Sequence, residues 1–124
     1  MLFSVFVHLW RAFMTSQHPN FPFSQFVEFV VDPRHQANLV VALQERFEGF
    51  TRTYPGFIRA SVHVSEDRQR VLSHVLWQSK EDCEAAVANS EQGEGDVWGL
   101  IRAYETKAIT FNAYEQVGEI VGRR

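Results

Sequence analysis

An α+β fold, with one antiparallel sheet and helices on one of its faces, is predicted by three features of the sequence. Four segments have the alternating or β-branched character of strands, one segment repeats apolar residues at helical spacing, and a capping-box-like start indicates a second helix. These segments follow one another as strand, helix, strand, strand, helix, strand. That order is the split βαβ, or ferredoxin-like, arrangement, in which the second face of the sheet stays bare.

The first strand and the first helix are predicted within residues 25–54. QFVEFVV, at the start of this range, alternates and is rich in residues that favour strands. Asp32 and Pro33 then provide a helix N-cap and a first-turn proline. Apolar residues recur after this at intervals of four, four and three, which indicates one buried stripe of a helix ending near Tyr54. The stripe consists of Leu39, Leu43, Phe47 and Phe50.

A tight hairpin is predicted next, from FIRASVHVS (57–65) to RVLSHVLWQ (70–78), with Asp67 and Arg68 at the centre of its turn. Since paired residue numbers keep a constant sum, the predicted register pairs His63 with Leu72, Ser61 with His74, and Ile58 with Trp77.

Side-chain alternation then separates two faces of the hairpin. The nearly all-apolar face should contact the helices and holds Ile58, Ala60, Val62, Val64, Val71, Ser73, Val75 and Trp77. The other face is mixed, as subunit interfaces often are, and holds Phe57, Arg59, Ser61, His63, Leu72, His74 and Leu76. Glu28 of the first strand is expected on this mixed face.

The remaining elements are a second helix, a break and a last strand. Ser79 and Asp82 form a capping-box-like start for a helix that continues through Ala88. NSEQGEGD is a glycine-containing break, DVWGLIRAYE a further helical turn or two, and AITFNAYEQV the last strand.

The chain of 124 residues is expected to form one domain at 25–124, preceded by an extension at 1–24. The extension reads as a short amphipathic helix followed by a proline-containing linker, or as an upstream start with Met14 the natural beginning. His8 and Arg11 interrupt its apolar run, so we expect no membrane span there. We also expect no secretory signal, because the run has neither positive charge before it nor a small-residue cleavage site after it.

Composition excludes several classes of function. The formal net charge of −3 has no basic excess that would attract nucleic acid. Cys83 is alone, which excludes an intrachain disulfide and a CxxC metal site and fits a reducing cytoplasm. His63 and His74 have no evident third ligand, so we expect no metal site.

The succession FVEFVVDP, YPGFIRASVHVS, RVLSHVLWQSKEDCEAA and FNAYEQV resembles the antibiotic biosynthesis monooxygenase family over residues 25–117. The resemblance implies a dimeric α+β barrel, that is, a homodimer formed through the exposed sheet face with a cavity between sheet and helices in each subunit. It also implies oxidation of a small aromatic substrate by dioxygen, with no metal, flavin or haem as cofactor.

Trp77 matches the family's strand-ending tryptophan and is the first candidate catalytic residue, because its indole offers an N–H donor and a flat face. Ser73 lies on the same face, at a position where quinone-forming members carry asparagine, and could assist at a substrate oxygen. Cys83 stands where an aromatic residue is common in the family. The expected pocket lining is Phe47, Phe50, Val62, Trp98 and Tyr104.

Two further functions stay open at this point. The same pocket could hold a small molecule without chemistry, as a binding or stress-response module, or it could serve a cyclase or isomerase that moves protons without oxygen. His63, His74 and Arg59 are expected at the subunit interface rather than in the pocket. Trp98 and Tyr104, together with Tyr54, could close the pocket mouth.

Overall fold

The computed structural model describes residues 21–91 and 97–123 of the chain. The expected N-terminal helix and most of the glycine-containing break lie outside these residues. The described elements are β1 (Phe23–Val30), α2 (Pro33–Gly49), β2 (Phe57–Val64), β3 (Arg70–Trp77), α3 (Lys80–Glu91), α4 (Val97–Ala103) and β4 (Ala108–Glu115). A 3₁₀ turn, η1 (Thr51–Thr53), follows α2. This order confirms the predicted succession of strands and helices.

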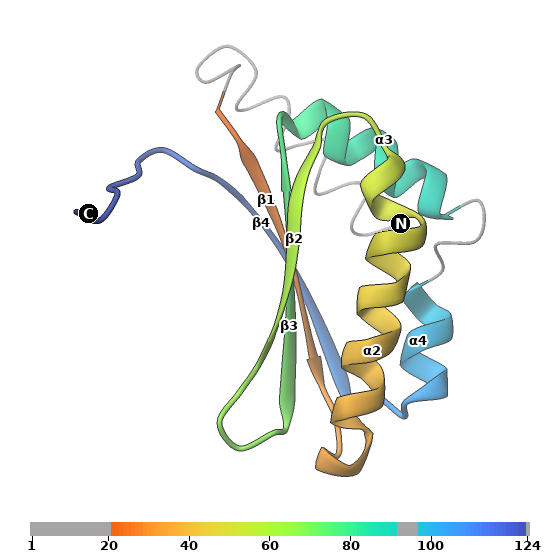
Figure 1. The fold of residues 1–124 in the computed structure, drawn as a ribbon. Coiled ribbons are helices and arrows are strands. Elements are labelled where there is room, and N and C mark those ends of the chain that lie inside the picture. The colour runs from red at the N-terminus through yellow and green to blue at the C-terminus, as the bar shows by residue number, and fades with distance from the viewer. Residues whose placement is uncertain (1–20, 92–96, 124) are drawn as a thin grey trace.

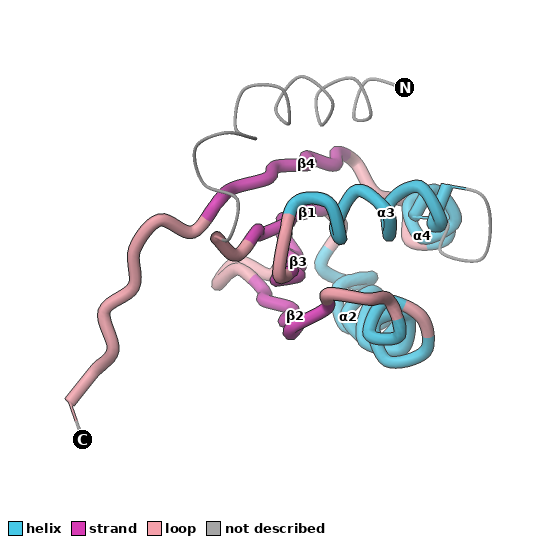
Figure 2. The backbone as a smooth tube through the Cα atoms, turned by 90° about the horizontal axis from the view of Figure 1, so that it is seen from above, coloured by secondary structure: helices cyan, strands magenta, loops and turns pink. Residues whose placement is uncertain are grey.

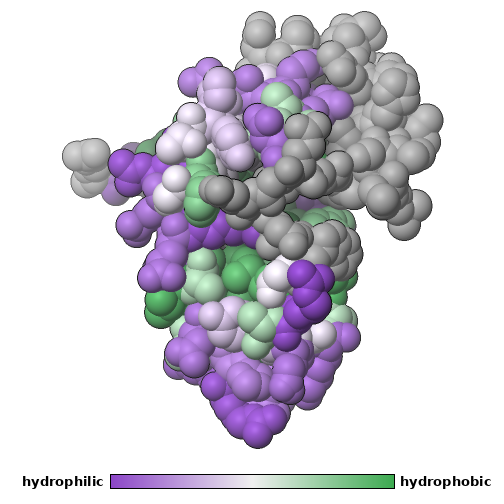
Figure 3. All heavy atoms as spheres, turned by 90° about the vertical axis from the view of Figure 1, so that its right-hand side faces the viewer, coloured by the Kyte–Doolittle hydropathy of each residue, from purple (hydrophilic) through white to green (hydrophobic). Residues whose placement is uncertain are grey.

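The four strands form one antiparallel sheet in the order β2-β3-β1-β4. The three helices lie on one side of it, and residues after β4 extend away from the body on the other side (Figures 1 and 2). The predicted ferredoxin-like fold, with helices on one face of an antiparallel sheet, is therefore confirmed. Seen from the helix side, hydrophobic atoms form a band at mid-height, with hydrophilic side chains above and below it (Figure 3).

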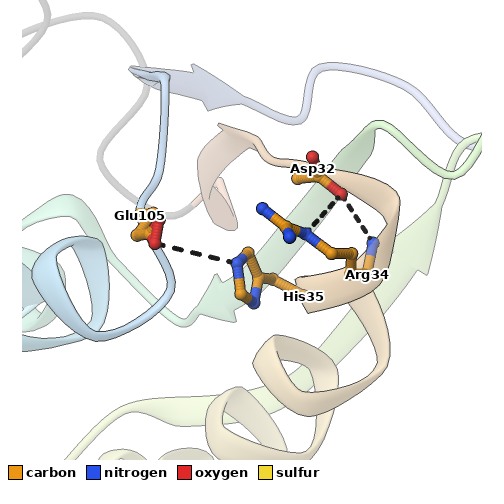
Figure 4. Close-up of polar contacts among 4 residues, drawn as sticks. All are labelled: Asp32, Arg34, His35 and Glu105. Atoms are coloured by element: carbon orange, nitrogen blue, oxygen red, sulfur yellow. Dashed lines mark hydrogen bonds and ion pairs between the residues drawn. The ribbon is translucent and has the colours of Figure 1, made fainter.

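The start of α2 is fixed as the sequence predicts. Asp32 accepts a hydrogen bond from the backbone N–H of Arg34 at 2.9 Å, and Pro33 occupies the first turn. That backbone hydrogen bond, assisted by the Arg34 charge, lowers the pKa of the Asp32 carboxyl group. Nearby, His35 Nε2 lies 4.0 Å from Glu105 Oε2, which links α2 to the turn after α4 (Figure 4).

The end of α2 differs from the prediction. The helix stops at Gly49, five residues before Tyr54, and Phe50 is its C-cap with 41% of its surface exposed. The buried stripe of α2 therefore consists of Leu39 and Leu43, with Phe47 partly buried beside them. The predicted stripe included Phe50 because its spacing from Phe47 is helical. Spacing alone does not show whether a residue at a helix end is covered by the rest of the protein.

Gly56 makes the sharp entry into β2. Its φ of +84° is in the left-handed region, and its carbonyl accepts a hydrogen bond from the Gln78 N–H at 2.8 Å. A Cβ atom at this position would overlap the Asp82 side chain. Only glycine allows the β2 entry and the start of α3 to approach this closely.

The hairpin register is confirmed along most of its length. His63 pairs with Leu72 and Ser61 pairs with His74. Towards its start the prediction is wrong, because a bulge between Phe57 and Arg59 pairs Phe57, not Ile58, with Trp77. The extra residue exchanges the two faces, so Phe57 packs on Trp77 and Ile58 is 41% exposed.

The core between sheet and helices consists of two clusters of buried residues. The first contains Phe23, Val75, Trp77, Cys83, Ala86 and Ala113. The second contains Phe29, Val31, Leu39, Leu43 and Val71. Phe47 packs against both clusters and so connects them.

Candidate functional site

The candidate site lies on the helix-facing side of the sheet, where two adjacent rows of residues cross all four strands. We call them the middle rows: Ala60, Val75, Gln25 and Ala113 in one, and Val62, Ser73, Val27 and Phe111 in the other. Six of these eight residues are Ala, Val or Ser. The flanking rows carry larger groups, among them Trp77 with Phe23 and Phe29 with Ile109.

The middle rows carry shorter side chains than the flanking rows. Although they face the helices, Gln25, Val27, Ala60 and Val62 are only partly buried, in contrast to Phe23, Phe29 and Val71 in the flanking rows. A flat apolar molecule would fit such a surface, because pockets for small molecules are concave and mostly apolar with a few polar groups.

Trp77, at the end of β3, forms one end of this surface. Its side chain is buried, with 1% of the residue exposed, and the ring of Phe57 packs against it edge to face at a centroid distance of 6.0 Å. Its indole N–H donates to the side-chain oxygen Oε1 of Gln25 at 3.2 Å. The candidate donor of Trp77 therefore has a partner within the protein.

Ser73 lies in the second middle row and is 4% exposed. Its hydroxyl donates a long hydrogen bond of 3.4 Å to the backbone carbonyl of Val27. A bond of this length is weak, so a better acceptor could replace the carbonyl at little cost.

The sequence reasoning did not single out Gln25. The sequence did contain a pattern that indicates Gln25. Gln25, Val27 and Phe29 alternate at strand spacing, and Gln25 is the polar member of this otherwise apolar set. The reasoning followed the alternation of Glu28 instead, and Glu28 lies on the opposite face of the sheet.

The expected lining residues have different positions. Phe47 contacts both core clusters, and Val62 and Tyr104 pack against the second one. Tyr54 packs against the first cluster. Phe50 is exposed at the end of α2, and the side chain of Trp98 lies outside the described part of the structure.

The open face of the sheet carries the residues that the sequence reasoning assigned to an interface. The ring of Phe26 stacks on His74 at a centroid distance of 4.4 Å and meets Tyr114 edge to face at 5.6 Å. His74 Nε2 lies 3.0 Å from Ser24 Oγ, and His63 Nε2 lies 2.9 Å from Ser61 Oγ. Burial lowers the pKa of His74, and the Arg59 charge adds to this shift.

This face also has a shallow hollow of about 230 Å³, lined by Phe26, Glu28, Leu72, Asn112 and Tyr114. It lies on the other side of the sheet from Trp77 and Ser73. The hollow therefore belongs to the face predicted to bind a second subunit, and we do not assign the candidate chemistry to it.

The remaining reactive groups offer little chemistry. Cys83 is 2% exposed, and burial raises the pKa of its thiol to about 12, so the thiolate is absent near neutral pH. Among residues 21–91 and 97–123, no three His, Cys, Asp or Glu side chains are placed to hold a metal ion. No helix in this part of the chain is long and apolar enough to cross a membrane.

Comparison with known proteins agrees with this fold. The chain is 34% identical over 61 residues to tetracenomycin-F1 monooxygenase of Streptomyces glaucescens, covering 49% of this chain and 54% of that protein. The chain thus matches about half the length of this relative.

Two solved structures share the fold. One is a monooxygenase from the gene ActVA-Orf6 of Streptomyces coelicolor in complex with nanaomycin D, with a TM-score of 0.71 and 21% identity over 83% of this chain and 94% of that one. The other is a dimeric ferredoxin-like protein from an uncultured marine organism, with a TM-score of 0.63 and 17% identity over 83% of this chain and 100% of that one.

The family described as antibiotic biosynthesis monooxygenase has a sequence model that matches residues 22–95, which include β1, α2, the β2–β3 hairpin and all of α3. The candidate residues Gln25, Ser73 and Trp77 all lie within this match. The chain belongs to the antibiotic biosynthesis monooxygenase family.

Proposed function

We propose that the protein is a cofactor-independent monooxygenase that oxidises an electron-rich aromatic or polyketide-like small molecule with dioxygen. The observation that carries the proposal is the polar group of Trp77, Gln25 and Ser73 on an apolar, partly accessible sheet surface in a chain of this family. Membership of the family and the match to a tetracenomycin-F1 monooxygenase support the reaction class.

The chemistry requires a substrate that can itself reduce dioxygen. An anthrone-like CH₂ group loses a proton to give a carbanion that is delocalised as a phenolate. The carbanion adds dioxygen and a proton to form a hydroperoxide, which loses water to leave a carbonyl group. One oxygen atom thus enters the product and the other leaves as water, and the substrate supplies all four electrons.

The protein's contribution in this scheme is to bind, orient and stabilise. The Trp77 ring and the apolar lining, including Phe47, Val62 and Tyr104, would hold the flat substrate in a site with little water. Ser73, with its weak internal hydrogen bond, would stabilise the developing oxyanion by donating to it, and Trp77, whose indole N–H donates to Gln25, would orient the substrate with its flat face. Phe50 and Trp98 stay candidate lining residues, and Trp98 is also a candidate for the mouth of the pocket.

A homodimer formed through the open sheet face is part of the proposal. This face carries the exposed Tyr114, and the chain beyond β4 carries apolar side chains that the described structure leaves almost bare. Val117 is 70%, Ile120 100% and Val121 81% exposed. Exposed apolar groups of this kind commonly mark an interaction surface, and a second copy would cover both the sheet and this segment.

We also expect a cytoplasmic location, because the chain uses a single cysteine.

Oxygen uptake tests the proposed reaction. Purified protein is mixed with a panel of anthrones and hydroquinones without added cofactor, and the Trp77→Phe variant is measured beside it. Val41→Ala, at an exposed position of α2, is the matched control. We expect uptake by the natural protein and the control, and a loss of at least tenfold in Trp77→Phe.

Other outcomes point to the alternatives. Tight binding of panel members without oxygen uptake would replace the oxygenase by a small-molecule binding module. Conversion of a substrate under argon would indicate a cyclase or isomerase. Uptake that is unchanged in Trp77→Phe would move the site away from β3.

A further inference from the structure

The contact between Trp77 and Gln25 determines how the Gln25 carboxamide is oriented. An indole N–H is a donor and has no acceptor atom. The atom of Gln25 that lies 3.2 Å from Trp77 Nε1 is therefore the carbonyl oxygen Oε1. The amide nitrogen Nε2, with its two N–H donors, is directed away from the indole.

The location of Gln25 is unusual for a glutamine. It lies in a middle row on the central strand β1, between Val75 of β3 and Ala113 of β4. Its side chain faces the helices, and a polar group on such a face is costly unless its hydrogen bonds are made. Trp77 satisfies the carbonyl oxygen, and no described residue accepts a hydrogen bond from Nε2.

The other two polar groups of the site already donate to the protein. Trp77 donates to Gln25, and Ser73 donates to the Val27 carbonyl. Of these three side chains, only Gln25 retains donors for which residues 21–91 and 97–123 provide no acceptor. Its neighbours in the row are short, so a ligand above the middle rows could reach these donors.

We propose that the Gln25 carboxamide, held by the Trp77 indole, is the group that binds the ligand's oxygen atom. The ligand class is a flat aromatic molecule with a carbonyl or phenolate oxygen, because such an oxygen accepts from an amide N–H. Trp77 then acts as a positioning residue for Gln25 as well as an apolar wall. This inference rests on the proposed function only in placing the ligand on the helix-facing side of the sheet.

A double-mutant cycle on ligand affinity tests the proposal. The probe is emodin, a hydroxyanthraquinone that resembles a product and needs no oxygen to bind, and its affinity is measured by calorimetry under argon. The variants are Gln25→Met, Trp77→Phe and the double variant, with Gln44→Met as the matched control because Gln44 is exposed on α2. Methionine has nearly the length of glutamine but no N–H donor.

We expect Gln25→Met to weaken emodin binding about tenfold, which corresponds to one lost hydrogen bond, and Gln44→Met to leave it unchanged. In the Trp77→Phe background, Gln25→Met should still weaken binding several-fold, since the amide itself contacts the ligand. If Gln25→Met has no effect in that background, Gln25 acts only through Trp77, and the proposal is overturned. Failure of emodin to bind the natural protein would also overturn it.

The indole N–H resonance in a ¹H–¹⁵N spectrum provides a second readout that does not depend on activity. Trp77→Phe identifies the Trp77 signal. We expect Gln25→Met to move this signal upfield as the hydrogen bond is lost, and emodin to leave it near its position in the free protein. A large shift on adding emodin would show that the indole leaves Gln25 and donates to the ligand itself, against the proposal.

Emodin binding that depends on Gln25, without oxygen uptake on any substrate, would retain this inference and refute the oxygenase.

Discussion

Phe57 packs edge to face on Trp77, with ring centroids 6.0 Å apart and ring planes at 83°. A bulge at the start of β2 produces this contact, because it turns Phe57 to the helix side and leaves Ile58 41% exposed. Phe57 therefore lies beside the candidate site. Without the bulge, the hairpin register would place Ile58 at this position opposite Trp77.

Phe57→Ala should lower the free energy of unfolding by about 2 kcal/mol, less than for a fully buried phenylalanine because Phe57 is partly exposed. Ile58→Ala should change it by less than about 1 kcal/mol. Urea unfolding followed by far-UV circular dichroism measures both values. The reverse order, with Ile58 the costlier position, would mean that the bulge is absent in solution.

Gly56→Ala should destabilise the protein by about 1–3 kcal/mol, because alanine is strained at a φ of +84° and its Cβ atom would overlap Asp82. Gly49→Ala is the matched control, since no atom lies within 4 Å of its added Cβ and the residue ends α2. The control should be neutral or stabilising by up to about 1 kcal/mol. Equal unfolding midpoints for the two variants would contradict the close approach of β2 and α3.

His74 should make stability depend on pH. Burial, followed by the charges of Arg59 and His63, lowers the pKa of His74 in the folded state below the ordinary value of 6.5. The unfolded chain then binds more protons between the two pKa values, so stability rises with pH through this window and is constant above about 6.5. Below the folded pKa the penalty is fully present.

The check on His74 compares urea midpoints at several values between pH 5 and pH 8 for the natural protein and His74→Gln. The variant keeps the other histidines, so the difference between the two curves isolates His74. We expect the natural protein to lose more stability on acidification than the variant. Parallel curves would show that His74 titrates alike in the folded and unfolded states.

Cys83 should be unreactive in the folded protein. Burial raises its pKa to about 12, so almost no thiolate is present at pH 8. A thiol reagent such as dithionitrobenzoate should label less than a tenth of the protein in an hour at pH 8, and one equivalent at once in 6 M guanidinium chloride. Rapid labelling of the native protein would place Cys83 at an accessible surface rather than in the first core cluster.

Local patterns in the sequence were sufficient for the order of elements and for much of the sheet. The alternation of residues 25–31 and the Asp32–Pro33 start are short-range signals, and each is found in the structure within a few residues. The pairing of His63 with Leu72 also follows from the sequence, because a short turn fixes the register next to it.

Features that depend on contacts between distant segments were decided by the tertiary structure. The bulge at Ile58 cannot be predicted from the alternation of apolar and polar residues. One extra residue moves the side chains before it to the opposite face of the sheet, and the sequence around it has no pattern that marks this change. The pairing of Trp77 with Gln25 joins residues 52 positions apart, and neither one indicates the other in the sequence. Trp77 was identifiable as a candidate from its own chemistry, whereas Gln25 became one only when β1 paired with β3 and placed its carboxamide beside the indole.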